Sequence, residues 1–270
     1  KSWQGIHETP LSCLEQQFAE PPVEFANHVI WGWEGKMDKK TICNDLDSIK
    51  KKGFRAVIFE AGYKLPFKYL SEEWFKAIRT GVLEAKKRGM KVWIIDEGKY
   101  PSGFAGGKFS QERPDLRMQA LVIGDTIQIK RGEVMTNHKI APEIISAVAV
   151  STSGAPNRTV AINNGEISFN AGLDDWKVLL VKSDFRTAVT RAVNNPNGGK
   201  DATNSLCDYL NPIAVQQFID WTHEQYKKYL GKELGTTVLG FRGDEPDYAH
   251  LPWTPSICLL YTSPSPRDRT

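Results

Sequence analysis

Four short apolar runs in this sequence each end abruptly in a carboxylate, and this pattern constrains the fold more than any other feature. Continuous apolar runs are typical of parallel strands that are buried on both faces. The carboxyl ends of such strands are where parallel α/β folds carry their functional sites. The competing interpretation is that the acids cap the following helices or lie on loops. The runs are Val29-Ile30-Trp31-Gly32-Trp33-Glu34, Ala56-Val57-Ile58-Phe59-Glu60, Val92-Trp93-Ile94-Ile95-Asp96-Glu97 and Val238-Leu239-Gly240-Phe241-Arg242-Gly243-Asp244-Glu245.

Between the first three runs the sequence has the amphipathic pattern of helices. Asp38 is placed to cap one helix that Gly53 ends, and Ser71 is placed to cap a second that Gly89 ends. A strand at 91–95 follows. This β-α-β-α-β order predicts parallel strands joined by right-handed crossovers.

The pattern changes after a helix-like segment at Arg113–Ala120. From about 121 to 185 apolar and polar residues alternate with period two, and turn signals such as Asn164-Gly165 separate the strands. Helical pattern returns at Asn211-Pro212 and continues to Gly231, before a strand at 237–241.

We therefore expect an α/β fold: a partial (β/α)₈ barrel, with its first four strands and a β-rich insertion after strand three. The expected organisation is a lead-in at 1–27, the first part of the barrel at 28–120, the insertion at 121–185 and the continuation through strand four at 186–257.

Residues 258–270 are expected not to be native. Back-translated, Cys258-Leu259-Leu260-Tyr261-Thr262-Ser263 resembles the mosaic end of a transposase-based sequencing adapter. Because the chain also begins at Lys1, we expect both ends to be fragment ends and the second half of the barrel to be missing. A chain of this kind, as given, is expected not to turn over substrate.

The composition narrows the possible partners. The chain is 40% hydrophobic and 25% charged, its formal net charge is +3, and no apolar run is long enough to span a membrane. Lys-rich stretches lie at predicted helix C-termini, which suits the helix dipole better than nucleic-acid binding. Cys13, Cys43 and Cys207 are odd in number and far apart, so they indicate neither a disulfide framework nor a zinc site. We expect no membrane and no nucleic acid as partner.

The paired acids at the fourth run suit glycoside hydrolysis. That reaction commonly uses two carboxylic groups, one of which donates a proton to the leaving oxygen. Glu245 is the candidate proton donor, and Asp244 beside it could hold a neighbouring sugar hydroxyl. The competing interpretation is that Asp244 and Glu245 cap the next helix.

A second group of candidates surrounds the third run. The glycines of the loop at 101–107 permit close approach of backbone to a ligand, but they lack the spacing of a phosphate-binding loop. Aromatic side chains at the strand ends could present flat faces to sugar rings. The candidate substrate-binding residues are Trp31, Trp33, Glu60, Asp96, Glu97, Tyr100, Phe104 and Tyr248.

The sequence lacks the motifs of zinc-dependent hydrolysis and of a serine nucleophile. His223-Glu224 lies on a predicted helix, but position 227 is Lys, so the two-histidine zinc motif is absent and His223 is expected to pack or cap. No Gly-x-Ser-x-Gly elbow accompanies a histidine partner.

Six segments together carry a resemblance to a known family: Trp31-Gly32-Trp33-Glu34-Gly35, Gly89–Glu97, Tyr100–Gly107, Asp208–Pro212, Gly243–Pro246 and Trp253-Thr254-Pro255. They resemble bacterial glycoside hydrolases related to family 106, the α-L-rhamnosidase-like barrels. The likeness covers most of residues 21–257. The resemblance implies a (β/α)₈ catalytic domain, export to the periplasm or medium, and plant or host glycans as substrates. It implies no organic cofactor and admits calcium, although no ligand cluster in the sequence places an ion.

The triplet Asp244-Glu245-Pro246 is also similar to the Asn-Glu-Pro at the fourth strand of clan A glycosidases, where the Glu is the acid/base; Asp stands here in place of Asn. The chain is therefore expected to belong to a glycosidase. The alternative is a non-catalytic carbohydrate-binding barrel protein, which would not need a second carboxylate facing Glu245. A metal-dependent barrel would need a histidine pair on the first strand, and Val29–Trp33 contains none.

Overall fold

The computed structural model describes residues 10–20, 27–98, 101–186, 205–245, 251–255 and 257, which form a mixed α/β fold. The chain divides into two compact units. The described residues of the first unit are 10–20, 27–98, 101–108 and 217–245, and those of the second are 109–186, 205–216, 251–255 and 257. The predictions for the tail at 258–270 lie outside the described residues.

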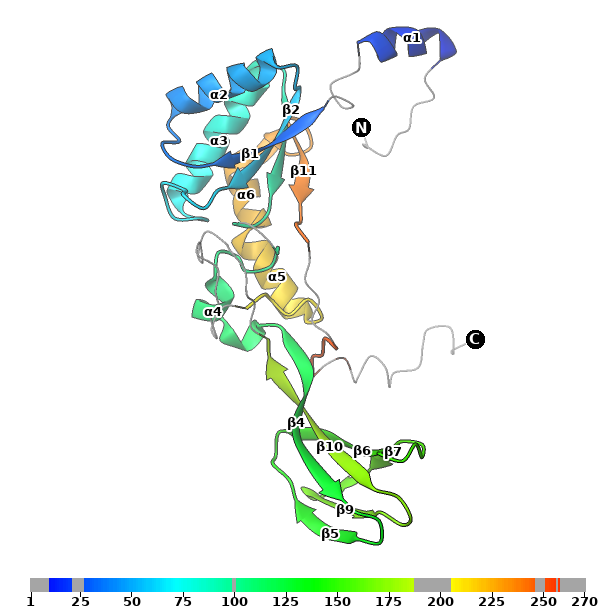
Figure 1. The fold of residues 1–270 in the computed structure, drawn as a ribbon. Helices are drawn as coiled ribbons and strands as arrows, with labels where there is room; N and C mark the ends of the chain where they lie inside the picture. Colours follow the sequence, from blue (N-terminus) through cyan, green and yellow to red (C-terminus); the bar gives the residue numbers. More distant parts are fainter. Residues whose placement is uncertain are drawn as a thin grey trace, which may run out of the picture. The chain divides into compact units, whose positions relative to one another are not determined.

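A four-stranded parallel sheet forms the centre of the first unit (Figure 1), which confirms the predicted strands and their direction. Each neighbouring pair in the order β1-β2-β3-β11 is parallel. The carboxyl ends of all four strands therefore meet at one edge of the sheet. The strands are β1 (His28–Trp33), β2 (Ala56–Ala61), β3 (Lys91–Ile95) and β11 (Val238–Arg242).

Helices α2 (Lys39–Lys51) and α3 (Glu72–Lys87) begin at the predicted caps. The Asp38 side chain accepts the Thr41 N–H at 2.9 Å, and the Ser71 hydroxyl accepts the Trp74 N–H at 3.3 Å. These bonds satisfy donors that a helix leaves open in its first turn. The apolar faces of both helices pack with one side of the sheet in a core that includes Trp33, Ile42, Leu46, Phe59, Trp74, Ile78 and Val82.

The helix predicted from Pro212 to Leu230 is two helices, α5 (Pro212–Trp221) and α6 (His223–Leu230). The break falls at Thr222, whose backbone has φ −115° and ψ −83°. The Thr222 hydroxyl donates to the Phe218 carbonyl at 2.6 Å, a local bond that competes with the regular helix and often bends it. A short 3₁₀ turn, η3 (Gly231–Glu233), follows α6.

The second unit is built from two antiparallel sheets. Trp176, Val178 and Ala147 lie at the centre of its apolar core. Asn164 and Gly165 both have positive φ, as the predicted tight hairpin between β8 and β9 requires. One sheet has the order β4-β10-β6-β7 and the other β5-β9-β8. The strands are β4 (Gln119–Ile129), β5 (Val134–Lys139), β6 (Ile144–Ser151), β7 (Arg158–Val160), β8 (Ile162–Asn163), β9 (Glu166–Asn170) and β10 (Trp176–Phe185).

The prediction of a helix-like segment at Arg113–Ala120 is wrong. A short helix, α4 (Lys108–Glu112), and a 3₁₀ turn, η2 (Pro114–Leu116), precede strand β4, which already begins at Gln119. Strand pairing overrides the local pattern, because Gln119 and Ala120 pair with the far end of β10. Within the predicted lead-in, α1 (Leu11–Ala19) is a helix.

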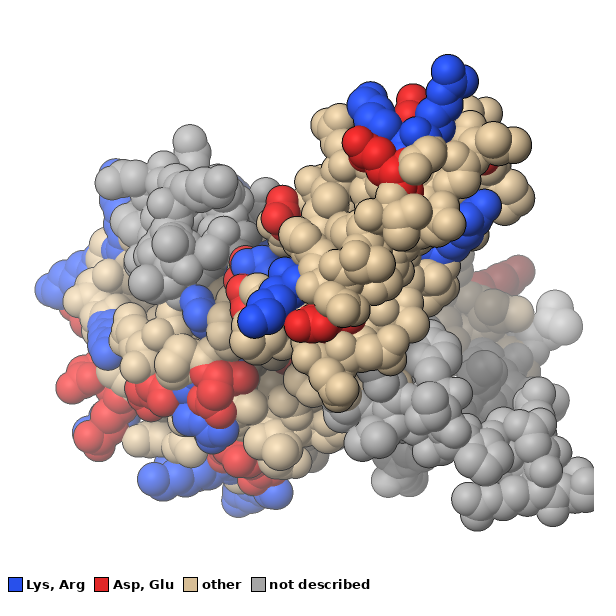
Figure 2. All heavy atoms as spheres, turned by 90° about the horizontal axis from the view of Figure 1, so that it is seen from below, with Lys and Arg blue, Asp and Glu red and all other residues tan. Residues whose placement is uncertain are grey.

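The surface carries charge of both signs. On the face drawn in Figure 2, Lys and Arg side chains are interspersed with Asp and Glu, and a broad stretch carries neither. Among the described residues, every helix is too short or too polar to cross a lipid bilayer.

Candidate functional site

The edge where the four parallel strands end carries the predicted acids. Glu60 lies within β2, Glu34 and the pair Asp96-Glu97 follow directly after β1 and β3, and the pair Asp244-Glu245 follows β11 after Gly243. These groups come from segments up to about two hundred residues apart in the chain, and the parallel sheet brings their strand ends to one edge.

At β1 and β2 the aromatic candidates belong mainly to the core. Trp33 is fully buried, and its ring lies 5.0 Å from that of Phe59 and 5.3 Å from that of the half-buried Trp31. Glu60 is half-buried at the end of β2. Trp33 thus presents no surface to a ligand in this structure, whereas Trp31 and Glu60 remain partly accessible.

Glu34, just beyond β1, organises the loop that follows β2. Its carboxylate accepts the N–H of Tyr63 at 3.2 Å. Gly62 lies against it so closely that a Cβ there would overlap the Glu34 side chain and approach the Trp33 carbonyl to 2.6 Å. A glycine is therefore required where these two strand ends meet.

Glu97 holds the glycine-rich loop around itself. It is 1% exposed, and it accepts the N–H groups of Gly98 at 2.7 Å, Ala105 at 2.6 Å and Gly106 at 3.0 Å. Burial raises the pKa of Glu97 to about 7, and the three N–H donors oppose that rise only in part. Both carboxylate oxygens are thus committed to the loop backbone. Phe104 in the same loop is also fully buried.

Asp96 lies in a second polar cluster with residues that sequence analysis did not assign to the site. It is 8% exposed, and Ser102 Oγ donates to its Oδ1 at 2.7 Å. His223 Nε2 lies 3.6 Å from Asp96 Oδ2. Burial raises the pKa of Asp96, chiefly because its charged form loses solvent, and burial likewise lowers the pKa of His223.

The histidine is held by the break between α5 and α6. Its Nδ1 lies 2.9 Å from the Thr222 hydroxyl, and its ring meets that of Phe241 on β11 edge-on at 4.6 Å. His223 does pack, as expected, but it also faces Asp96. Spacing along the chain carries no signal for this pairing, because Asp96 and His223 lie on distant segments that only the folded sheet brings together.

The Asp244-Glu245 pair is held in place by hydrogen bonds between the Asp244 backbone and Ser102. The Asp244 N–H donates to Ser102 Oγ at 2.7 Å, and the Ser102 N–H donates to the Asp244 carbonyl at 2.9 Å. Arg242 Nη2 is 3.9 Å from Asp244 Oδ1. Glu245 is exposed and has a positive φ of 39°. It is thus the most accessible acid of the two pairs. The candidates Tyr100 and Tyr248 lie outside the described residues.

No group of three or more His, Cys, Asp or Glu side chains in the described part of the chain is arranged to hold a metal ion. Asp96 and Glu97 contact Ser102, His223 and backbone N–H groups instead.

Comparison with known proteins supports the fold. No protein-family model matches the chain, and no curated protein sequence matches it. A solved structure described as a rhamnosidase from Novosphingobium sp. PP1Y aligns with 92% of this chain at a TM-score of 0.61 and 11% identity. The chain spans 41% of the length of that protein. A solved structure of an α-amylase from H. orenii aligns with 80% of this chain, at 14% identity and a TM-score of 0.31. The aligned part covers 39% of the amylase chain.

Proposed function

We propose that this chain contributes to the catalytic domain of a glycoside hydrolase, with its sugar-binding site at the carboxyl edge of β1, β2, β3 and β11. One observation carries the proposal: an exposed carboxylate, Glu245, stands at this edge directly after Asp244, whose backbone is held by hydrogen bonds to Ser102. Glu245 is the proton donor, and Asp244 beside it contacts the sugar. The fold likeness to a rhamnosidase supports the same class of function.

The finer parts of the proposal follow from the resemblance in the sequence. The four parallel strands form one half of a (β/α)₈ barrel, and the antiparallel unit is an insertion after the third strand. The substrate is a plant or host glycan, with α-L-rhamnosides as the first to be tested. The protein acts outside the cytoplasm and needs no organic cofactor.

The role of Glu245 determines the test. A general acid contributes most when the leaving group is poor, because an activated aryl leaving group departs without a proton. In the full-length protein, Glu245→Gln should therefore lower the turnover of poor leaving groups by roughly 10²–10⁴-fold, and that of activated aryl glycosides much less.

The matched control is Glu72→Gln, which changes an exposed acid in the first turn of α3 and should leave turnover intact. Equal losses on both kinds of substrate, or no loss, would remove Glu245 from the role of proton donor. Sugar binding without any turnover in the wild-type protein would instead support a carbohydrate-binding protein.

A further inference from the structure

Ser102 joins the ends of strands β3 and β11. Its Oγ donates to Asp96 Oδ1 and accepts from the Asp244 N–H, both at 2.7 Å. Its own N–H donates to the Asp244 carbonyl at 2.9 Å. Asp244 is thus held by both its backbone donor and its backbone acceptor, and the second of these belongs to the peptide group that leads into Glu245.

Asp96 determines which way the Ser102 hydroxyl points. A hydroxyl has one hydrogen, and an ionised carboxylate can only accept, so the hydrogen goes to Asp96 and a lone pair remains for Asp244. Asp96 is itself anchored, because its N–H donates to the Arg242 carbonyl at 3.2 Å and its Oδ2 faces His223. The orientation of the hydroxyl therefore follows from a buried and fixed group.

Glu245 needs such support from its neighbours. Its φ of 39° lies in the left-handed region, which is costly for a residue with a Cβ and persists where the surrounding structure holds it. The Ser102 contacts to the preceding residue restrain the peptide group that leads into Glu245.

We infer that Ser102 is a positioning residue, which fixes the backbone of Asp244 and so the direction in which the Glu245 carboxyl group leaves strand β11. Asp96 acts one step further back, by orienting the Ser102 hydroxyl. The inference rests on the proposed role of Glu245 as proton donor, and it assigns Ser102 a part in that reaction although Ser102 touches no substrate.

The first experiment needs no activity. Amide hydrogen exchange of Asp244, measured in the full-length protein, should become about tenfold faster in Ser102→Ala, because the amide loses its acceptor. Ser102→Thr keeps a hydroxyl and should restore slow exchange. The control Ser153→Ala removes another hydroxyl that donates to an aspartate, 2.6 Å from Asp174 Oδ1 in the second unit, and should leave the Asp244 amide unchanged. Unchanged exchange in Ser102→Ala would overturn the inference.

The second experiment is a double-mutant cycle in the full-length protein. Ser102→Ala should lower kcat for a poor leaving group by about 10²-fold with little change in KM, since a displaced acid loses alignment rather than binding. In a Glu245→Gln background the same change should cost nothing further, because the group being positioned is gone. A purely structural role would give losses that add.

The two proposals fail in different ways. If Glu245→Gln lowers turnover and Ser102→Ala does not, Ser102 has no positioning role while the glycosidase proposal stands. If Glu245→Gln has no effect, the proposed proton donor is wrong, and faster Asp244 exchange in Ser102→Ala would then describe a structural bond and not a catalytic one.

Discussion

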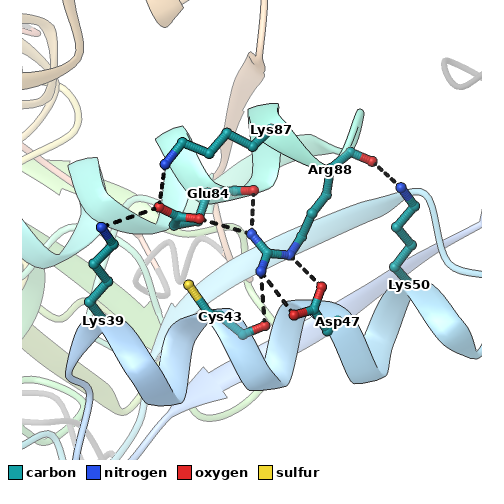
Figure 3. Close-up of polar contacts among 7 residues, drawn as sticks. All are labelled: Lys39, Cys43, Asp47, Lys50, Glu84, Lys87 and Arg88. Carbon is teal, nitrogen blue, oxygen red and sulfur yellow. Dashed lines mark hydrogen bonds and ion pairs between the residues drawn. The ribbon is translucent and has the colours of Figure 1, made fainter.

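Two nearly buried glutamates in the first unit show how differently one side chain can be used. Glu84 is a residue of α3 that is 6% exposed, and its carboxylate has Lys87 Nζ at 2.7 Å and Arg88 Nη1 at 3.0 Å (Figure 3). Glu97, 1% exposed, lies beyond β3 and accepts only neutral backbone N–H groups. Hydrogen bonds from Lys87 and Arg88 lower the pKa of Glu84 to about 2, while burial raises that of Glu97 to about 7.

The difference teaches that the depth of burial and the charge of the partners together decide whether a carboxylate remains charged. Cations stabilise the charged form of Glu84, and Figure 3 shows Lys39 and Asp47 extending the same network across the two helices. Neutral donors only partly replace the water that Glu97 loses. Glu84 therefore links two helices through its charge, whereas Glu97 holds a loop through neutral donors and has a pKa that burial raises.

The largest expected effect is on the stability of the first unit near neutral pH. The pKa of Glu97 is higher in the folded chain, about 7 against 4.5, so folding takes up a proton between these values. The free energy of unfolding should therefore fall as pH rises from 4.5 to 7, by up to about 3 kcal/mol, and level off above that. The free energy of unfolding can be measured at each pH from the hydrogen exchange of those β3 amides that exchange only by global unfolding.

Glu97→Gln is the variant that isolates this effect, since glutamine does not titrate. Between pH 4.5 and 7 the free energy of unfolding of this variant should decrease much less than that of the wild-type protein. A smaller fall should remain from Asp96, whose pKa is also raised by burial. An equal change of unfolding free energy with pH in Glu97→Gln and in the wild-type protein would contradict the raised pKa of Glu97.

The contribution of Glu84 to the free energy of unfolding should depend on pH in the opposite direction. Its pKa is lowered from 4.5 to about 2, so its contribution is present above pH 4.5 and is lost as pH falls toward 2. Glu84→Gln should lower the melting temperature at pH 7 and leave it unchanged at pH 2. Because Lys39 and Lys87 are mostly exposed, 1 M NaCl should shrink the difference at pH 7. A difference that is the same at both pH values would contradict the assignment.

Local signals in the sequence predicted most of the first unit. Ser71 and Asp38 stand one residue before their helices, and a cap requires only a few neighbouring residues. The Glu84 pairs with Lys87 and Arg88 follow helical spacing, whereas its contact with Lys39 requires a second helix.

The site was less predictable because its bonds join distant segments. Ser102 meets Asp244 across 142 positions, so no pattern along the chain marks Ser102 as anything but a loop residue. The strand at Gln119 has the same cause, since pairing with β10 overrode a local helical pattern. The helix break at Thr222 instead goes with a local bond from its hydroxyl to the Phe218 carbonyl. Acids at strand ends could be found from the sequence; which of them are buried could not.

Asp96 is intermediate between Glu84, which has cationic partners, and Glu97, which has only neutral donors. It gives the smallest of the expected effects. It is buried like Glu97, yet His223 can carry a positive charge 3.6 Å from its Oδ2. Burial lowers the pKa of His223, and the Asp96 carboxylate partly opposes that change. Asp96→Asn removes the opposing charge, so the pKa of His223 should fall further, as an NMR titration of its ring would show.

Asp47→Asn, which removes an acid of the α2–α3 network, is the matched control and should leave the His223 titration in place. An unchanged His223 pKa in Asp96→Asn would mean that Asp96 is uncharged when His223 titrates, and would group Asp96 with Glu97 as an acid kept neutral by burial.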